Sequence, residues 1–577
     1  MFHLLCQSYA THARQALTTV DVGQVSAAVI SDGSVNHATQ ELANIGHENG
    51  NAARGFRRFV AREHLLHGLS IYTYKSASKV QGKVQEVDIP LILPHELVHF
   101  FYMHHYQEFL SRFVGDLDGV EAYWHQSRGQ SWLREHPGAH LVGRHPRRCL
   151  PLRLHGDEAP VTKKYGVLFL NFCSVMLRDQ PSDLSRNLIC ALRNILINLE
   201  IVWEIIGWSF QVLLDGKMPS HDFEGNPLQG ERGAMAGLPV AGDFYFLVTQ
   251  IIGDWKWYYE TFGMEHNFYN TFNFCWLCGA DKSDGCHSGS DYREDAGWTQ
   301  TLVDNQTFMS NRHELASCAW AGFHIMLLLL DVMHIVCLGT LHVDIGSCMW
   351  QMIQEGVWAE AGDPTTWKES CAMQLERAYL RFVEWASDTK TDHREDKWDR
   401  NKLSMTSTLS KPYWKGKAAT NLAVARWLVH ATREDMQKNP DNPKACHRAN
   451  FWWGLISAIN LWQGGPQFVS EEDARSLRLY RQTTLFSHRA LQHLARRDCP
   501  DSLHWQPLPK HHLLDHVFRQ SSDLSEDACR LNPCWFWAFT DEDFVGSCAK
   551  ISKSQHARHK ELRTLEMWHL KLAMLFE

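Results

Sequence analysis

A long stretch without any strand pattern constrains the fold of this chain more than any other feature. Between Gly346 and the glycine pair at 464 and 465, apolar residues recur at helical spacing in three segments, 366–387, 417–432 and 448–462. A fourth helical segment, 471–497, follows Ser470, a residue type that caps helix N-termini, and has Asp473 at its third position. Convincing strand patterns occur only before this block. The sequence therefore predicts an α/β protein whose core is interrupted by a large helical insertion.

Length, charge and cysteine usage narrow the class of protein further. The chain has 577 residues, more than the roughly 250–300 that one hydrophobic core organises. Its net charge of −8 argues against a surface that coats nucleic acid everywhere, so any DNA contact needs local basic patches. Its 16 cysteines, several of them in apolar stretches, indicate reduced core thiols. With no signal-peptide pattern and no bilayer-length apolar run, we expect a nuclear or cytoplasmic protein without a membrane partner.

Strand-like and helix-like runs before residue 346 indicate the elements of the core. The apolar runs 149–154 and 167–176 flank a turn rich in glycine and proline, which predicts a β-hairpin. A long, largely apolar helix is expected over 184–214, and a strand over 244–252 that leads directly into a helix. Pro94 is suited to the first turn of an amphipathic helix. Residues 1–88 show little periodicity and are expected to form a loosely packed extension.

Acidic residues at two of these strand ends are candidate metal ligands. Asp157 follows the first strand in Gly156-Asp157, and Asp254 follows another in Gly253-Asp254. Carboxylates held on rigid strand ends suit two-metal phosphoryl transfer, and hard oxygen ligands suit Mg²⁺ or Mn²⁺. A third acidic group, residues 541–543, follows an aromatic run near the C-terminus. The alternative is that Gly-Asp at a strand end is ordinary turn chemistry.

Several fragments together resemble a known family. RLHGDEAPV, the later QIIGDWKWYYETFG, NFCWLCGAD, LLLLDVMHIVCLGTLH and FWAFTDEDFVG are similar to a transposon-derived protein family that is multiplied in dinoflagellate genomes. The patterns of that family include LHGDDAPV, KGDW, CPLC and DEDFVG. The family is in turn distantly similar to CACTA-type (En/Spm-like) DDE transposases. The likeness runs from about residue 91 to the C-terminus, and between 346 and 500 only length and helicity support it.

The resemblance implies a fold, a reaction and a set of catalytic residues. The fold is a ribonuclease-H-like mixed-sheet core, and the reaction is divalent-metal-dependent DNA cleavage or strand transfer. Asp157, Asp254 and Glu542 are the implied catalytic metal ligands, and Asp541 or Asp543 can substitute for the third. No recognisable DNA-binding module precedes the core, so a catalytically inactive, domesticated derivative that binds nucleic acid or protein is the first alternative.

The resulting domain organisation has five parts. The first part of the core carries a C-x2-C element, and the C-terminal part is expected to close the core after the insertion. The expected boundaries are 1–88 for the extension, 89–140 for a helical segment, 141–345 for the first part of the core, 346–500 for the helical insertion and 501–577 for the closing part.

Two further motifs suggest transition metals. Cys275 and Cys278 form a single C-x2-C, half of a tetrahedral zinc site, or else a pair of core thiols. The expected partners that complete such a site are Cys286 and His287, His313, or Asp331 and His334.

The second motif is His95-Glu96-x-x-His99, which on a helix is typical of zinc peptidases. Tyr102 stands where the extended peptidase pattern needs glycine, and Pro94 puts His95 in the first helical turn. A zinc metallopeptidase is therefore a further alternative, and a structural zinc protein without a reaction is another.

Basic residues near the candidate ligands are the expected DNA contacts. DNA phosphates bound beside a metal site need basic side chains to neutralise them. The alternative is that each basic patch is an ordinary solvent-exposed surface. The predicted nucleic-acid-binding residues are Arg147, Arg148, Lys163 and Lys164 around the first hairpin, and Lys550, Lys553 and Arg558 after the last acidic group.

Overall fold

The computed structural model describes residues 69–80, 83–178, 180–196, 198–264, 271–407 and 410–576. These residues form a mixed α/β protein with two compact units. The first unit comprises the described parts of 1–263, 308–328 and 539–577, and the second comprises 264–307 and 329–538. The first 68 residues of the expected N-terminal extension lie outside the described part. Within that part, no helix is both long enough and apolar enough to cross a membrane.

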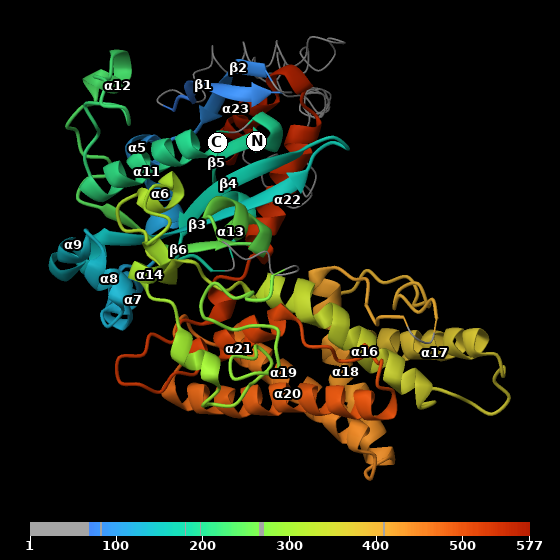
Figure 1. Ribbon diagram of the computed structural model, residues 1–577. Coiled ribbons are helices and arrows are strands. Elements are labelled where there is room, and N and C mark those ends of the chain that lie inside the picture. Colours follow the sequence, from blue (N-terminus) through green and yellow to red (C-terminus); the bar gives the residue numbers. More distant parts are fainter. Residues whose placement is uncertain are drawn as a thin grey trace. The chain divides into compact units, whose positions relative to one another are not determined.

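The first unit is built on a mixed four-stranded sheet (Figure 1). Its spatial order is β5-β4-β3-β6; β3, β4 and β5 are antiparallel neighbours, whereas β6 runs parallel to β3. The predicted hairpin and the later strand are confirmed. The bounds are β3 (Cys149–Pro160), β4 (Gly166–Ser174), β5 (Asn187–Arg193) and β6 (Tyr245–Gly253).

The helix expected over 184–214 is wrong in its first half. The chain instead forms α10 (Ser182–Ser185), strand β5, the turn η3 (Asn194–Leu196) and only then helix α11 (Leu199–Asp215). Strand β5 is buried along almost its whole length, so its side chains are apolar on both faces and its sequence lacks the alternation of a half-exposed strand. Helix α11 then makes the crossover that a parallel strand such as β6 requires.

Helices and a second hairpin surround this sheet. The hairpin was not predicted from the sequence, whereas α5 begins at Pro94 as expected. Two C-terminal helices return to this unit: α22 packs on β3 and β4, and α23 packs on β5 and β2. The principal bounds are β1 (Tyr72–Val80), β2 (Lys83–Leu91), α5 (Pro94–His104), α6 (Tyr106–Phe109), η1 (Leu110–Val114), α7 (Leu117–Ser127), α8 (Ser131–Glu135), α9 (Ala139–Arg144), α12 (Gly230–Ala234), α13 (Trp255–Thr261), α15 (Ala316–Ala319), α22 (Phe539–Lys553) and α23 (Lys560–Phe576).

The second unit is helical, as the strand-free block predicts. All four expected helices are present, and Ser470 caps α20 by accepting a hydrogen bond from the Asp473 backbone N–H at 3.1 Å. This unit comprises 264–307 and 329–538, and the helical segment expected over 346–500 lies within it. Its main helices are η6 (Met333–Thr340), α16 (Leu341–Gln354), α17 (Trp367–Asp388), α18 (Ala418–Lys438), α19 (Pro443–Gly464), α20 (Glu471–Asp498) and α21 (Pro509–Ser521).

Candidate metal centres

The repeated Gly-Asp motif has a structural cause in the first unit. Gly156 of β3 and Gly253 of β6 are paired across the parallel strands. A Cβ atom on Gly156 would lie 2.1 Å from the ring of Trp257, and one on Gly253 would lie 2.3 Å from it. Only glycine therefore fits beneath this ring. Trp257 belongs to α13, which Asp254 caps by accepting a hydrogen bond from the Trp257 backbone N–H at 2.7 Å.

Asp157 and Asp254 are neighbours because of this register. Each is the next residue after a paired glycine, and adjacent strands in a sheet lie about 4.8 Å apart. Successive residues of a strand point to opposite faces, and the glycines face the Trp257 ring. Asp157 therefore points to the other face of the sheet, away from the Trp257 ring, whereas the side chain of Asp254 turns to the N-terminus of α13. Both residues are half-buried. Among the described residues, the metal-binding groups do not include Asp157, Asp254 and Glu542.

Helix α22 packs over β3 and β4 and brings the C-terminal acidic group to this face. Its buried residue Asp541 accepts two hydrogen bonds from Arg186, at 3.0 and 2.9 Å. Burial opposes ionisation of Asp541, but the charge of Arg186, aided by His155 and Arg153, lowers its pKa to about 2. His155 and Arg153 alternate with Asp157 along β3 and share its face. Glu542 follows directly and is half-buried, so the third predicted ligand lies on a helix packed against the strand that carries the first.

Buried polar side chains lie along the face of β3 that carries Asp157, and the sequence did not indicate them. Arg153 donates a hydrogen bond to Gln250 of β6 at 2.9 Å, and the amide of Asn171 in β4 lies 2.9 Å from a ring nitrogen of His155. All four side chains are at most 3% exposed. Such cross-strand polar pairs fix side-chain positions within a low-dielectric environment. They hold the face of β3 that carries Asp157 in a fixed conformation.

In the second unit, the C-x2-C pair meets two histidines from a distant helix. Cys275 and Cys278 lie in a loop, whereas His512 and His516 stand one turn apart on the same face of α21. All four are buried. Cys278 Sγ lies 3.2 Å from His512 Nε2 and 3.4 Å from His516 Nε2, the two Nε2 atoms are 3.1 Å apart, and Cys275 Sγ is 3.7 Å from His516 Nε2.

These separations suit a tetrahedral zinc ion. Zinc–nitrogen and zinc–sulfur bonds of about 2.05 and 2.3 Å place two nitrogens about 3.3 Å apart and a sulfur about 3.6 Å from a nitrogen. Hydrogen bonding, first from Cys275 and then from the two imidazoles, lowers the pKa of Cys278, while burial raises that of Cys275. Two sulfurs and two imidazole nitrogens are the donor set that zinc prefers. The cluster can hold a zinc ion.

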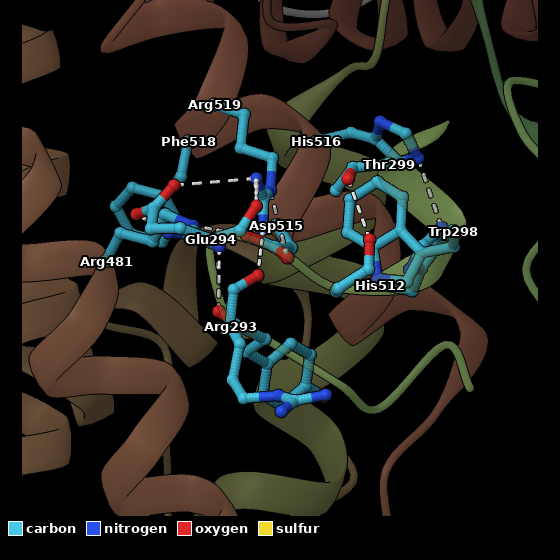
Figure 2. Close-up of polar contacts among 12 residues, drawn as sticks. Arg293, Glu294, Trp298, Thr299, Arg481, His512, Asp515, His516, Phe518 and Arg519 are labelled. Carbon is cyan, nitrogen blue, oxygen red and sulfur yellow. Dashed lines mark hydrogen bonds and ion pairs between the residues drawn. The ribbon is translucent and has the colours of Figure 1, made fainter. Parts of the chain in front are cut away.

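Aromatic and ionic contacts keep the zinc-binding loop against α21. The ring of Trp298 packs on His512 and His516, with centroids 4.5 and 4.8 Å away. On the same helix, buried Asp515 pairs with Arg481 (Figure 2). The guanidinium of Arg481 also donates a hydrogen bond to the Tyr292 carbonyl at 2.9 Å. Arg481 also pairs with Glu294, and Arg519 donates to the Arg293 carbonyl at 2.7 Å. Ligands from segments far apart in the sequence are thereby held together.

The histidines that complete the cluster with Cys275 and Cys278 are not the residues expected from the sequence. Asp331 and His334 bind each other, with Oδ2 and Nδ1 2.7 Å apart, and Asp331 also accepts a hydrogen bond from the Ala538 backbone N–H. In the described part of the chain, the metal-binding groups include neither this pair nor Cys286, His287 or His313. The actual signal is His512-x3-His516 directly after a helix-starting proline, Pro509.

The peptidase motif does not form a metal site. His95 lies 2.8 Å from Ser209 Oγ, and His99 Nδ1 lies 2.8 Å from the carbonyl of Val240. Glu96 is paired with Arg232 through two hydrogen bonds, which removes its capacity to act as a general base. Neither histidine belongs to a metal-binding group among the residues with described positions.

The predicted basic residues fall into two kinds. Arg147 is paired with Glu121 and Asp118 at 2.7 and 2.8 Å, and Arg148 is paired with Asp243 at 3.2 Å. These two arginines are therefore already neutralised by carboxylates. The others are exposed: Lys163 and Lys164 in the β3–β4 turn, Lys550 and Lys553 on α22, and Arg558 just after it.

Comparison with protein-family models and with curated proteins finds no match to this sequence. The function is therefore inferred from the geometry of the two units.

Proposed function

We propose that this chain is a transposase-like enzyme that cleaves or joins DNA strands with two divalent metal ions, Mg²⁺ or Mn²⁺, held by Asp157, Asp254 and Glu542. The observation that carries this proposal is the pairing of Gly156 with Gly253, which makes Asp157 and Asp254 neighbours at the ends of two adjacent strands. The helix with Glu542 packs on β3, the strand that carries Asp157. Three acidic residues from distant parts of the sequence thus belong to one unit.

The topology supports a ribonuclease-H-like interpretation of this unit. In that fold, three antiparallel strands are followed by a helix and by a fourth strand that lies parallel to and beside the first. The order β5-β4-β3-β6, with α11 before β6, has this arrangement. The resemblance to transposon-derived proteins is the source of the assignment of Asp157, Asp254 and Glu542 as ligands. Fold topology alone specifies no reaction, so the proposal rests on the carboxylates.

The residues present suit hard divalent cations. All three side chains are half-buried and offer oxygen donors, the ligands that Mg²⁺ and Mn²⁺ prefer. When bound, two such ions activate a water or a DNA 3′-hydroxyl and stabilise the charge that develops at the phosphate. Strands β3 and β6 hold two of the ligands rigidly, because Trp257 is seated against both glycines. The Arg186–Asp541 pair anchors the helix that carries the third.

Zinc belongs to the same proposal as a structural ion of the second unit. Cys275, Cys278, His512 and His516 leave no position for a substrate, because four protein ligands complete a tetrahedron. Zinc there fixes the loop to α21. Its role is to stabilise the second unit and not to take part in the reaction.

A cationic cavity in the second unit supports nucleic acid as the partner. Its volume is about 510 Å³, and five basic residues line it against two acidic ones, Asp281 and Asp284. At its wall the ring of Tyr413 stacks on His342, with centroids 4.8 Å apart and an interplanar angle of 10°. Basic side chains beside a partly exposed aromatic ring suit a phosphate backbone and a stacked base. The basic residues are Lys282, Lys411, Arg489, Arg496 and Lys510.

Nicking of supercoiled plasmid in the presence of Mn²⁺ tests the proposal. We expect Asp157→Asn and Asp254→Asn to abolish nicking by the full chain, because each removes a metal ligand while preserving shape. Glu158→Gln is the matched control for the first change. Glu158 is adjacent to Asp157, but it accepts hydrogen bonds from Lys256 and Asn194 at 3.2 and 2.8 Å and points to the other face.

The third ligand has its own control. Glu542→Gln should abolish nicking, whereas Asp543→Asn, a change at an exposed neighbour, should preserve it. Equal nicking by the wild type and by both aspartate variants would refute the proposal. Binding of DNA without Mn²⁺-dependent nicking by the wild type would also refute it, and would favour the catalytically inactive derivative.

A further inference from the structure

The cationic cavity of the second unit has the size of a site for one small ligand. Its volume of about 510 Å³ lies within the range of roughly 300–1,000 Å³ that is typical of pockets enclosing a single small molecule. The cavity can therefore enclose one nucleotide, whereas a base pair with both of its backbones is too large to enter. Its walls are formed by Phe274 and by residues from the segments 281–290, 338–343, 411–413, 489–496 and 506–510, all of them in this unit.

The ring of Tyr413 is held rigidly at the wall of this cavity. It is 40% exposed, and the ring of His342 in α16 is stacked on it. The next residue, Trp414, ties this segment to α16, because its N–H donates to the His342 carbonyl at 2.7 Å and its carbonyl accepts a hydrogen bond from His342 Nδ1 at 2.5 Å. A Cβ atom on Gly346 would lie 2.8 Å from the Tyr413 backbone nitrogen, so the segment lies directly on α16. The ring is therefore already ordered for stacking with a base.

Positive charge is spread along one wall of the cavity. Arg489 and Arg496 lie seven residues apart on α20, so they project on the same side, roughly 10 Å apart along its axis. Arg489 donates a hydrogen bond to Gln492 Oε1 at 2.6 Å, which fixes its guanidinium, and its contact with the 88% exposed Asp284 at 3.7 Å neutralises it little. Lys411 and Arg496 are exposed and form no ion pair with any described residue. Charges spread over this length suit successive phosphates of a strand better than one isolated phosphate group.

We propose that this cavity binds one unpaired nucleotide of a DNA strand, with its base stacked on Tyr413 and the neighbouring phosphates against Lys411 and the arginines of α20. Stacking on an aromatic ring tolerates any base, because every base has a π-face. A paired base is excluded, since the cavity has no room for the partner strand. The inference rests on the proposed function, because it takes DNA as the partner. It adds that the second unit distinguishes opened or single-stranded DNA from intact duplex.

Binding of synthetic strands to the full chain in EDTA tests the inference without any cleavage. One labelled probe is a strand of abasic residues with a single thymine at its centre, and the other is the same strand without the base. We expect the wild type to bind the first probe roughly 5- to 150-fold more tightly, which is the contribution of one stacked base. Tyr413→Leu should abolish this preference, and Tyr413→Phe, which keeps the ring, should preserve it. Trp453→Ala is the control, because Trp453 is 44% exposed but lies outside the cavity.

Three outcomes would overturn the inference. Equal affinity of the wild type for the two probes would show that only the strand backbone is bound. A preference that persists in Tyr413→Leu would place the base elsewhere. A deoxynucleoside triphosphate that displaces the one-base probe at a lower concentration than the unlabelled probe does would assign the cavity to a free nucleotide.

The design also separates this inference from the proposed cleavage and from misfolding. Asp157→Asn removes a proposed metal ligand in the first unit and should leave the preference between the probes unchanged, so a failure of nicking does not affect this result. A readout without any variant is the fluorescence of 2-aminopurine in place of the thymine. Stacking on Tyr413 should quench this fluorescence when the wild type saturates the probe, and unchanged fluorescence would contradict the proposal even if Tyr413→Leu does not fold.

Discussion

Removing the charge of Asp541 should destabilise the first unit strongly, because its partner is buried with it. Asp541 is 0% and Arg186 4% exposed, and two hydrogen bonds of 3.0 and 2.9 Å join them. Asp541→Asn preserves the shape but leaves a buried guanidinium without a counter-charge, which costs about 3–5 kcal/mol. The lowered pKa of Asp541, about 2 against an ordinary value near 3.9, has the same sign and corresponds to a contribution on the order of 2–3 kcal/mol.

Hydrogen exchange followed by mass spectrometry is the appropriate assay, since a chain with two units does not unfold in one step. Amide protection in α22 and β5 should fall by roughly two to three and a half powers of ten at pH 7. Asp543→Asn is the control, because Asp543 is exposed and accepts a hydrogen bond from the Ser182 hydroxyl at 2.7 Å. Protection within threefold of the wild type in Asp541→Asn would refute the reasoning.

The same pair fixes the pH dependence of the first unit. Because the folded-state pKa of Asp541 is lowered, its contribution to stability is complete above the unfolded value near 4 and is lost as the pH falls toward 2. The wild type should therefore lose protection in α22 between about pH 4 and 2 more steeply than Asp541→Asn does. The double change Arg186→Met with Asp541→Leu should recover much of the stability at pH 7, since an apolar pair leaves no buried charge. Parallel profiles for wild type and Asp541→Asn would contradict the assignment.

Two further predictions concern the strand pair and the cavity. Gly253→Ala should displace the ring of Trp257 and lower the free energy of unfolding of the first unit by about 1–3 kcal/mol. It should also reduce Mn²⁺-dependent nicking of plasmid DNA at least tenfold. Unchanged nicking would show that this register does not position the carboxylates. The double change Lys411→Glu with Arg496→Glu should weaken binding of single-stranded DNA. It should also reduce the steepness of the plot of log affinity against log salt concentration by about 1 per lost phosphate contact. The control Lys438→Glu, which lies elsewhere in the unit, should change neither the affinity nor the salt dependence.

Local sequence signals predicted the elements that carry the catalytic candidates. The hairpin before Asp157, the strand before Asp254 and the capped helix after Ser470 all follow from periodicity and turn residues within a few positions. Strand β5 did not follow, because a strand covered on both faces is as uniformly apolar as a buried helix. Alternation along the chain disappears where both faces are buried.

The site contacts depend on distant pairings that no local pattern encodes. Cys278 meets His512 across more than two hundred positions, and an i, i+4 histidine pair on a helix is common without metal. The opposite error arises at His95 and His99, where a complete local motif is present but Ser209 and Val240 engage the side chains instead. Spacing predicts which residues can share a face, and the tertiary fold decides what that face meets.

Anomalous diffraction from crystals of the full chain soaked in Mn²⁺ tests the central proposal most directly. We predict manganese peaks within about 2.2 Å of carboxylate oxygens of both Asp157 and Asp254, with Glu542 as a further ligand, and no such peak in Asp157→Asn. Manganese absent from these carboxylates in otherwise well-occupied crystals would contradict the two-metal reaction.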